Sequence, residues 1–367
     1  MKKVLATTLA WVMALALCTT SWADGEGAGG TTPSASATVV AKIGEQGYAT
    51  LKEAFEAVQD GNNTITVLSD TSIPANTQIK GSVLLDLNGH KVTVTRDGSQ
   101  SYNAFEVRNN ATFSVKDSQA NGELDLGKFG ILLDDGKMML FSGTVTVKPD
   151  HAGQSTVVAM TGDSDFTMNG GLLYADGTSC FNPGYWGTQS ISISGGTVKC
   201  TGGQAVVGCG TAFASIGLNV AISGSVVMDT KDGNGNIAEL ISNAEQDNMK
   251  ASVVVTGGTF PNDVKAYVAQ GSIVQKDGGK YKVVADGAIT SGTYTSQPTV
   301  PSGYKVTANA DGTWTVSRSS HYYPSTSDTT ASTTKGSPKT FDAGISIYAM
   351  TAMLSLTGMA YVGKKKF

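Results

Sequence analysis

The sequence contains one pair of adjacent carboxylates, Asp134 and Asp135, whose chemistry has to be considered first. Glycoside hydrolysis uses two carboxyl groups that flank the scissile bond, and general acid–base work also needs further partners in a cleft. Here the pair follows the apolar run 131–133 and leads directly into Gly136. A short apolar run followed by Asp and Gly is typical of a strand that ends in a turn. We therefore expect a turn, and a polysaccharide-cleaving enzyme remains the alternative.

Two other patterns could hold metals but are better explained without them. Segment 232–236, Asp-Gly-Asn-Gly-Asn, places oxygen ligands at alternate positions, like the start of a calcium loop. It lacks the glycine that should follow, and Asn243 stands where a closing Glu belongs. The histidines are spread over His90, His151 and His321 and form no metal-ligand spacing. The sequence predicts neither a metal site nor a cofactor.

Segment 181–187, Phe-Asn-Pro-Gly-Tyr-Trp-Gly, is the candidate ligand-binding loop. Its aromatic residues are Phe181, Tyr185 and Trp186. Exposed aromatic rings beside Gly and Pro are suited to stacking on a sugar or docking on a protein. The alternative is that these rings fold back over the protein as a local lid.

The composition predicts an exported β protein with an acidic body. The chain has 26 Lys+Arg and 30 Asp+Glu. The first 23 residues contain two lysines, and the segment after Thr340 contains three lysines and one aspartate. Both ends are expected to be removed on export, which leaves 21 basic and 29 acidic residues. This balance argues against a nucleic-acid partner, which requires clustered Lys and Arg. The 45 glycines with only nine prolines indicate short strands joined by tight turns, so all-β is the expected class.

Three cysteines lie in the expected mature chain, at Cys180, Cys200 and Cys209. This number is small and odd, so it does not predict a disulfide framework. One pair, Cys180 with Cys200 or Cys200 with Cys209, is an alternative to three buried thiols. The spacing does not decide between them.

The N-terminus is typical of a secretory signal peptide. Two lysines precede an apolar segment over 4–17, and segment 21–23, Ser-Trp-Ala, has small residues at the positions that a signal peptidase reads. We predict cleavage after Ala23, which makes residues 1–23 the signal peptide. Leu17 stands before Cys18, where a lipoprotein signal has a small residue, so a lipid anchor is not expected.

The C-terminus, 337–367, combines a Pro-x-Thr pentapeptide, an apolar run over 343–362 and a basic tail. An apolar run of about twenty residues can cross a bilayer as a helix, with the lysines kept on the cytoplasmic side. The pentapeptide is Ser337, Pro338, Lys339, Thr340 and Phe341. This arrangement resembles the sorting signal of Gram-positive surface proteins, commonly Leu-Pro-x-Thr-Gly. The resemblance implies that a sortase cuts after Thr340 and links the protein to peptidoglycan; a plain membrane anchor is the alternative.

Between the two ends, the sequence divides into a lead, a helix, a strand region and a stalk. Residues 24–38 are rich in Gly, Ala, Ser and Thr and predict a flexible lead, and 319–336 predict a Ser/Thr-rich stalk. Segment 50–53, Thr-Leu-Lys-Glu, is a capping box that starts a helix over 50–59, in which Leu51, Ala54, Phe55 and Val58 share one face. Strands are expected over 64–68 and 83–87.

A repeat of apolar-x-apolar-x-Gly occupies the middle of the chain. Its marker glycines, 28, 25, 28 and 34 residues apart, are Gly143, Gly171, Gly196, Gly224 and Gly258. A period of this length with short strands and no intervening helix predicts a solenoid whose turns pair in parallel, a right-handed parallel β-helix. Ile191, Ile193 and Val198 should then face the bore, and glycines should take the corners with positive φ. About eight turns are expected between Gly81 and Val284.

The helix motif and the following segment 85–90, Leu-Asp-Leu-Asn-Gly-His, resemble the start of pectin-lyase-like β-helix domains in surface proteins of Gram-positive gut anaerobes. The resemblance covers residues 39–284 and implies a β-helix with an N-terminal capping helix. Hairpins over 273–284 and 304–316 should close the C-terminal end, with 285–318 as a hairpin unit.

Together these features predict a non-catalytic, cell-wall-anchored surface protein. Its task would be display or adhesion to a glycan, a matrix protein or a neighbouring cell. The alternatives are a polysaccharide lyase or glycoside hydrolase, and a structural surface-layer component. Converging charged residues on one solenoid face would favour an enzyme.

Overall fold

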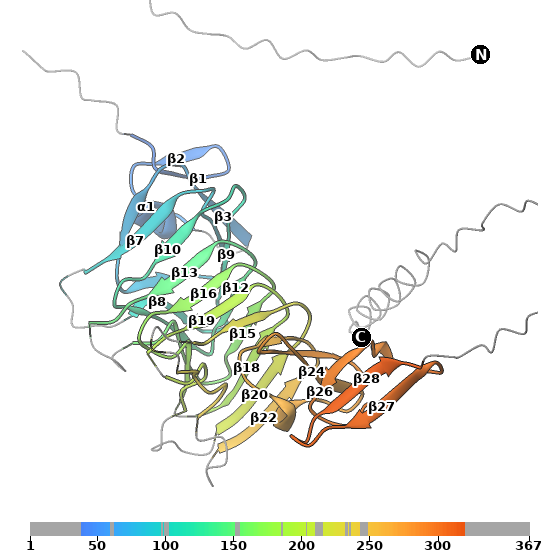
Figure 1. Cartoon of the computed structure of the whole chain (residues 1–367). Helices are drawn as coiled ribbons and strands as arrows, with labels where there is room; N and C mark the ends of the chain where they lie inside the picture. Colours follow the sequence, from blue (N-terminus) through green and yellow to red (C-terminus); the bar gives the residue numbers. More distant parts are fainter. Residues whose placement is uncertain are drawn as a thin grey trace, which may run out of the picture. The chain divides into compact units, whose positions relative to one another are not determined.

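The computed structural model describes residues 38–319 except 59–61, 97, 99–102, 151–154, 185, 203, 210–215, 232–233, 235 and 243–248. The predicted signal peptide, stalk and sorting signal lie outside these residues, apart from Ser319. In the described part, nearly all regular structure is β-strand, and successive turns stack as a parallel β-helix (Figure 1). The predicted fold class is confirmed.

Three sheets collect the strands, and we name them A, B and C. Sheet A contains β2 (Gln46–Tyr48), β1 (Ala41–Ile43), β3 (Asn62–Val67), β6 (Ser82–Asp86), β9 (Thr112–Lys116), β12 (Lys137–Leu140), β15 (Asp165–Met168), β18 (Thr188–Ile193), β20 (Ile216–Ile222) and β22 (Met249–Val255). Sheet B begins with β4 (Thr71–Pro74), β7 (Lys91–Thr95), β10 (Glu123–Asp125), β13 (Thr144–Val147), β16 (Leu172–Ala175), β19 (Thr197–Cys200), β21 (Val227–Asp229) and β23 (Gly258–Phe260). Sheet C contains β5 (Thr77–Ile79), β8 (Asn103–Arg108), β11 (Gly130–Asp134), β14 (Val158–Thr161) and β17 (Phe181–Pro183).

Strands of successive turns pair in parallel on every sheet, as in β13 with β16 and β16 with β19. Within the described residues, five turns contribute a strand to all three sheets, since sheet C has five strands. Three later turns supply strands to sheets A and B, and two of these reach sheet C through isolated bridges at Val207 and Ile241. The first turn begins at β3, which already pairs in parallel with β6, so the expected start near Gly81 is one turn too late.

Inward side chains of each strand fill the bore, because neighbouring residues of a strand point to opposite faces. Ile191, Ile193 and Val198 are all buried, as predicted. Phe166 and Phe181 meet edge to face across the bore, with ring centroids 4.8 Å apart. One continuous hydrophobic core therefore extends through the solenoid.

The corners between sheets A and B explain the repeat glycines. The five marker glycines have φ values of 63° to 108°, which confirms the predicted corner positions. At Gly196 a Cβ atom would also lie 2.5 Å from the carbonyl oxygen of Gly171 in the preceding turn. Only glycine combines a left-handed backbone with this close stacking of turn on turn.

The N-terminal end is closed by helix α1 (Leu51–Glu56), which is shorter than the predicted 50–59. Thr50 and Glu53 form the predicted capping box, and the apolar face of the helix is buried. The Phe55 ring reaches into the bore, 5.8 Å from the ring of Phe105 and 6.3 Å from that of Phe113. Strands β1 and β2 continue sheet A in antiparallel order beyond β3.

The C-terminal end continues sheet B with antiparallel strands (Figure 1). In order from β23 these strands are β25 (Lys280–Ala285), β24 (Ser272–Asp277), β26 (Gly292–Tyr294), β28 (Trp314–Arg318) and β27 (Tyr304–Ala308), with short 3-10 helices η1 (Lys265–Tyr267) and η2 (Asp286–Ala288) between them. The antiparallel unit thus begins at β24, earlier than residue 285. A small separate core, including Ile273, Tyr294 and Val316, supports it.

Candidate functional site

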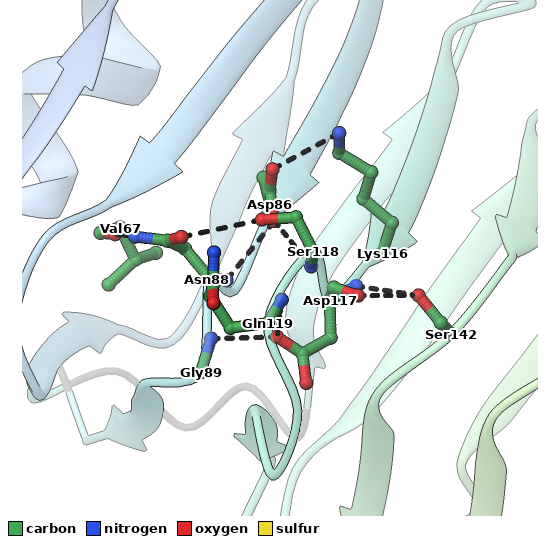
Figure 2. Close-up of polar contacts among 9 residues, drawn as sticks. All are labelled: Val67, Asp86, Asn88, Gly89, Lys116, Asp117, Ser118, Gln119 and Ser142. Atoms are coloured by element: carbon green, nitrogen blue, oxygen red, sulfur yellow. Dashed lines mark hydrogen bonds and ion pairs between the residues drawn. The ribbon is translucent and has the colours of Figure 1, made fainter.

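A cluster of polar side chains, which we call the A–B corner cluster, lies where β6 and β9 leave sheet A (Figure 2). Asp86 is the last residue of β6 and is only 5% exposed. Its Oδ1 accepts from the backbone N–H groups of Asn88 and Ser118, both at 3.1 Å. Its Oδ2 lies 3.1 Å from the Lys116 ammonium nitrogen. Hydrogen bonds and an ion pair thus compensate the burial of this carboxylate.

Asp117 is the second carboxylate of the A–B corner cluster. Its Oδ1 accepts from the Gly89 N–H at 2.7 Å, and its Oδ2 accepts from the Gly122 N–H at 2.7 Å. Its own N–H donates to Ser142 Oγ at 2.8 Å, in the following turn (Figure 2). Asp117 therefore joins three successive turns and holds the ends of the longer corner 117–122.

The A–B corner cluster has the residue types of an acid–base site but not the geometry. A catalytic carboxyl group must direct an oxygen at the proton it transfers. Both oxygens of Asp86 and of Asp117 already accept hydrogen bonds or pair with a lysine. Side-chain acceptors of this kind satisfy backbone donors at irregular corners, so the cluster stabilises the fold.

Asp134 and Asp135 lie at a different corner of the solenoid, where the chain passes from sheet C to sheet A. Asp134 ends β11 and accepts from the Arg108 guanidinium. Asp135 has a φ of 55° and accepts from the Asp163 N–H at 2.9 Å. Asp and Asn tolerate this left-handed conformation in turns. The two residues therefore form a tight backbone turn and stabilise it through their side chains, as predicted.

Arg108 also belongs to a polar network on the outer face of sheet C, centred on Glu106. Burial raises the pKa of Glu106, but hydrogen bonds from Gln78 at 2.6 Å, Asn103 at 2.9 Å and Arg108 at 3.1 Å outweigh it. The pKa of Glu106 is consequently lower than its usual value of 4.5. A carboxylate kept ionised in this way is a poor general acid at neutral pH.

The structure corrects one member of the candidate ligand-binding loop. Phe181 is fully buried as the first residue of β17, where it pairs with Val158 and packs on Phe166. It belongs to the core because the chain has already entered sheet C at this residue. Tyr185 lies outside the described residues. Trp186 is exposed over 51% of its surface, as expected for a ligand contact.

The backbone beneath Trp186 is firmly held. The amide of Gln189, which is completely buried, donates to the carbonyl oxygens of Gly184 at 3.0 Å and Trp186 at 3.1 Å. Gly187 has a φ of 87° and stacks on Gly162 of the preceding turn, where a Cβ atom would come within 2.3 Å. Trp186 is therefore presented on a fixed corner rather than on a long loop.

The same corner also carries acidic and hydroxyl side chains. We call it the Trp186 corner, and its members are Asp135, Asp163, Trp186 and Thr188. The exposed Asp163 Oδ1 accepts from the Thr188 N–H at 2.8 Å, one turn further along. Within the described residues, its Oδ2 accepts no hydrogen bond. An exposed indole and carboxylate and hydroxyl groups on one corner could together supply stacking and hydrogen bonds to a polar ligand.

Sequence reasoning missed Asp163 and Gln189 at this corner. Gly162-Asp163 occupies the corner that Asp135-Gly136 occupies one turn earlier, so an alignment of the turns by their corners would have found Asp163. Gln189 gave no signal, because a buried glutamine on a strand reads as an outward polar residue.

The residues of the two metal-like patterns lie partly outside the described ranges. Lys231 and Ile237 form an antiparallel bridge around segment 232–236, most of which lies outside the described residues. His90 Nδ1 is 3.5 Å from Asp70 Oδ1, while His151 and His321 are not described. No group of three or more His, Cys, Asp or Glu residues in the described ranges is arranged to hold a metal ion.

The predicted processing sites cannot be placed. Ala23 and the pentapeptide Ser337 to Phe341 lie outside the described residues, as does the apolar run 343–362. Among the residues that are described, no helix is long and apolar enough to span a membrane.

Comparison with known proteins gives no relative. No protein-family model matches the sequence, no curated protein matches it, and no solved structure matches the fold.

Proposed function

We propose that this chain is a non-catalytic surface protein of a Gram-positive cell that binds an extracellular glycan through the Trp186 corner. The observation that carries the proposal is the half-exposed Trp186 indole on a backbone locked by Gln189 and Gly187. A rigid aromatic ring loses little conformational entropy when a ligand stacks on it. Sugar rings have apolar C–H faces for such stacking, and their hydroxyl groups donate to carboxylates such as Asp163.

The wider role follows from the two ends of the chain and the solenoid between them. The expected signal peptide and the sorting-signal resemblance support export and attachment to peptidoglycan. Between them, stacked turns build a stiff frame from short strands, which suits display outside the cell. The carboxylates Asp86, Asp117 and Glu106 serve in hydrogen-bond networks, which favours binding over hydrolysis.

A glycan array probed with the purified chain tests the binding function. We expect retention on a defined set of glycans and at least about a tenfold loss for Trp186→Ala, since a stacking aromatic contributes more than about 1.4 kcal/mol. Val227→Ala, a change of another exposed apolar residue on the solenoid, is the matched control and should bind normally. Equal binding by wild type and Trp186→Ala would remove the Trp186 corner from the proposal, and shortening of the bound glycan would favour an enzyme.

Attachment to the wall is tested separately. In the native host, digestion of peptidoglycan should release the protein with a wall fragment on the Thr340 carbonyl carbon, which mass spectrometry identifies. Thr340→Ala should abolish this adduct and leave the protein extractable by detergent. Detergent extraction of the unaltered chain, with its C-terminus intact, would instead identify a plain membrane anchor.

A further inference from the structure

Two cysteines meet at the corner between sheets B and C. Cys200 is the last residue of β19 and pairs with Ala175 at the end of β16, one turn earlier. Cys180 lies beyond the corner that follows Ala175, directly before β17. Both side chains are fully buried. The fold thus brings residues from two successive turns, twenty positions apart in the chain, into one site.

The contacts of the two thiols overlap. The Cys180 thiol lies 3.5 Å from the carbonyl oxygen of Lys199, the residue joined to Cys200. The Cys200 thiol lies 3.1 Å from the carbonyl oxygen of Thr178, two residues before Cys180. Each thiol also affects the pKa of the other. Each sulfur atom therefore lies against the backbone beside the other cysteine, the neighbourhood that a disulfide requires.

The two thiols differ in acidity. Burial raises the pKa of Cys180 well above its usual value of 9.0. The neighbouring Cys180 thiol lowers the pKa of Cys200 and outweighs the effect of burial. The thiolate is the nucleophile in disulfide exchange, so Cys200 is the sulfur that reacts first.

We propose that Cys180 and Cys200 are a disulfide site that links the fifth and sixth turns of the solenoid. The oxidant is a disulfide of another molecule, either a small-molecule disulfide or an oxidised thiol oxidoreductase. While this part of the solenoid is still open during folding, the Cys200 thiolate attacks one sulfur of that disulfide, which forms a mixed disulfide and expels the first thiol. Cys180 then loses its proton and attacks Cys200 Sγ, which expels the second thiol. Two protons and two electrons pass to the oxidant.

Cys209 is the rival partner, since the sequence alone allows Cys200 with Cys209. Its N–H donates to Ser242 Oγ at 3.0 Å, in the turn that follows. Burial raises its pKa to about 12, as burial also raises the pKa of Cys180, so position rather than acidity separates the two rivals. The contact between Cys180 and Cys200 selects that pair, and Cys209 keeps its thiol.

The bond would enclose the segment that carries Trp186. Residues 181–199 lie inside the loop that it closes, and they include Gly184, Trp186 and Gln189. A covalent link at the base of this segment limits the opening of the turn that presents Trp186. The pairing itself depends only on the two thiols, so it does not rest on export or on glycan binding.

A tryptic map of the full-length chain distinguishes the pairings. The chain, with Cys18→Ser, is refolded in a glutathione redox buffer, unfolded in the presence of an alkylating agent that blocks its remaining thiols, and digested. Trypsin cleaves after Lys137, Lys199 and Lys231 and leaves the Lys148–Pro149 bond intact. Cys180 then lies in peptide 138–199, whereas Cys200 and Cys209 share peptide 200–231.

We expect peptides 138–199 and 200–231 to appear as one linked species that separates on reduction, with the alkyl group on Cys209. Cys209→Ser should give the same linked species, which shows that the fold accepts the pair without the rival. Cys180→Ser should abolish it. An internal bond in peptide 200–231, or alkylation of all three cysteines in a chain whose circular dichroism is native, would overturn the proposal.

Discussion

Carboxylates at the corners of this solenoid act mainly on its backbone. In the A–B corner cluster, Asp117 accepts from Gly89 in the preceding turn, while Ser142 of the next turn accepts from its N–H (Figure 2). Asp117 also accepts from Gly122 in its own turn. Each bond satisfies a donor that an irregular corner leaves outside the strand ladders. The shape of the longer corner 117–122 therefore depends on one side chain.

Asp117→Ala should lower the free energy of unfolding by about 2 kcal/mol, because two backbone N–H groups lose their acceptor. Equilibrium urea unfolding measures the change. Asp311→Ala is the matched control, since Asp311 also accepts from a backbone N–H, that of Thr313 at 3.0 Å, but in an exposed hairpin turn. If both substitutions cost the same, the A–B corner cluster has no special role in stability.

Glu106 gives a prediction about pH. Its pKa is lower in the folded chain than the usual 4.5, so its stabilising effect is complete above about pH 4.5 and is lost as the pH falls through the folded pKa. Glu106→Gln should cost about 1 kcal/mol at pH 7, through weaker hydrogen bonds to Gln78, Asn103 and Arg108.

The measurement is the difference in unfolding free energy between wild type and Glu106→Gln, followed from pH 7 to pH 3. The difference should shrink on acidification. A difference that stays constant over this range would show that the ionised carboxylate is not what the network stabilises.

The aromatic segment shows where sequence reasoning at the residue scale succeeds and fails. Trp186 is exposed, as the ligand-binding interpretation requires, but Phe181 is in the core. Strand β17 has only three residues, so its alternation, Phe181 in, Asn182 out and Pro183 in, is too short to distinguish from a loop. The opposite error concerns Gln189, whose polarity hides its buried position between Gly184 and Trp186.

At the scale of elements, the corners between sheets A and B stack backbone on backbone. A Cβ atom at Gly196 would lie 2.5 Å from the Gly171 carbonyl oxygen and 2.7 Å from the Met168 methyl group. Gly177 has the same φ of 80°, yet no atom lies within 4 Å of its Cβ position. These two glycines separate the cost of a left-handed backbone from the cost of close stacking.

Gly177→Ala should therefore cost about 1 kcal/mol of unfolding free energy, the penalty of the left-handed region alone. Gly196→Ala should cost about 2 kcal/mol more, because the preceding turn must move to admit the methyl group. Thermal and urea unfolding of both variants provide the comparison. Equal costs would mean that the turns do not approach each other as closely as described.

The sequence predicts these elements well because their signals are local and repeated. The marker glycines set the corners, and the capping box of Thr50 and Glu53 sets the start of α1. The ends of the elements are less predictable. The helix ends at Glu56, and the parallel region extends from β3 to β23 rather than from Gly81 to Val284, because pairing with a neighbour decides where stacking starts and stops.

At the scale of the described solenoid, the contacts that matter join residues far apart in the sequence. The Glu106 network takes residues from two turns. The A–B corner cluster takes residues from four, because the Asn88 side-chain amide also donates to the carbonyl oxygen of Val67 at 3.0 Å. A periodic pattern predicts that turns stack, but the outward partners depend on the register between them. This is why the fold could be predicted and the polar clusters could not.

The account depends on turns that stack in register, and one row of outward residues on sheet B provides a ruler for it. The row begins at Ser72, which pairs with Thr93 of the next turn. It continues, one residue per turn, through residues 125, 146, 174 and 199 and ends at Asp229. Six turns therefore separate Ser72 from Asp229, and five separate Thr93 from Asp229. At about 4.8 Å per turn, the backbone separations are about 29 Å and about 24 Å.

Pulsed electron paramagnetic resonance between spin labels on noncanonical amino acids at these positions measures both separations without altering the cysteines. We predict two narrow distance distributions that differ by about 5 Å, the height of one turn. Indistinguishable distances, or broad distributions for both pairs, would contradict the stacked solenoid.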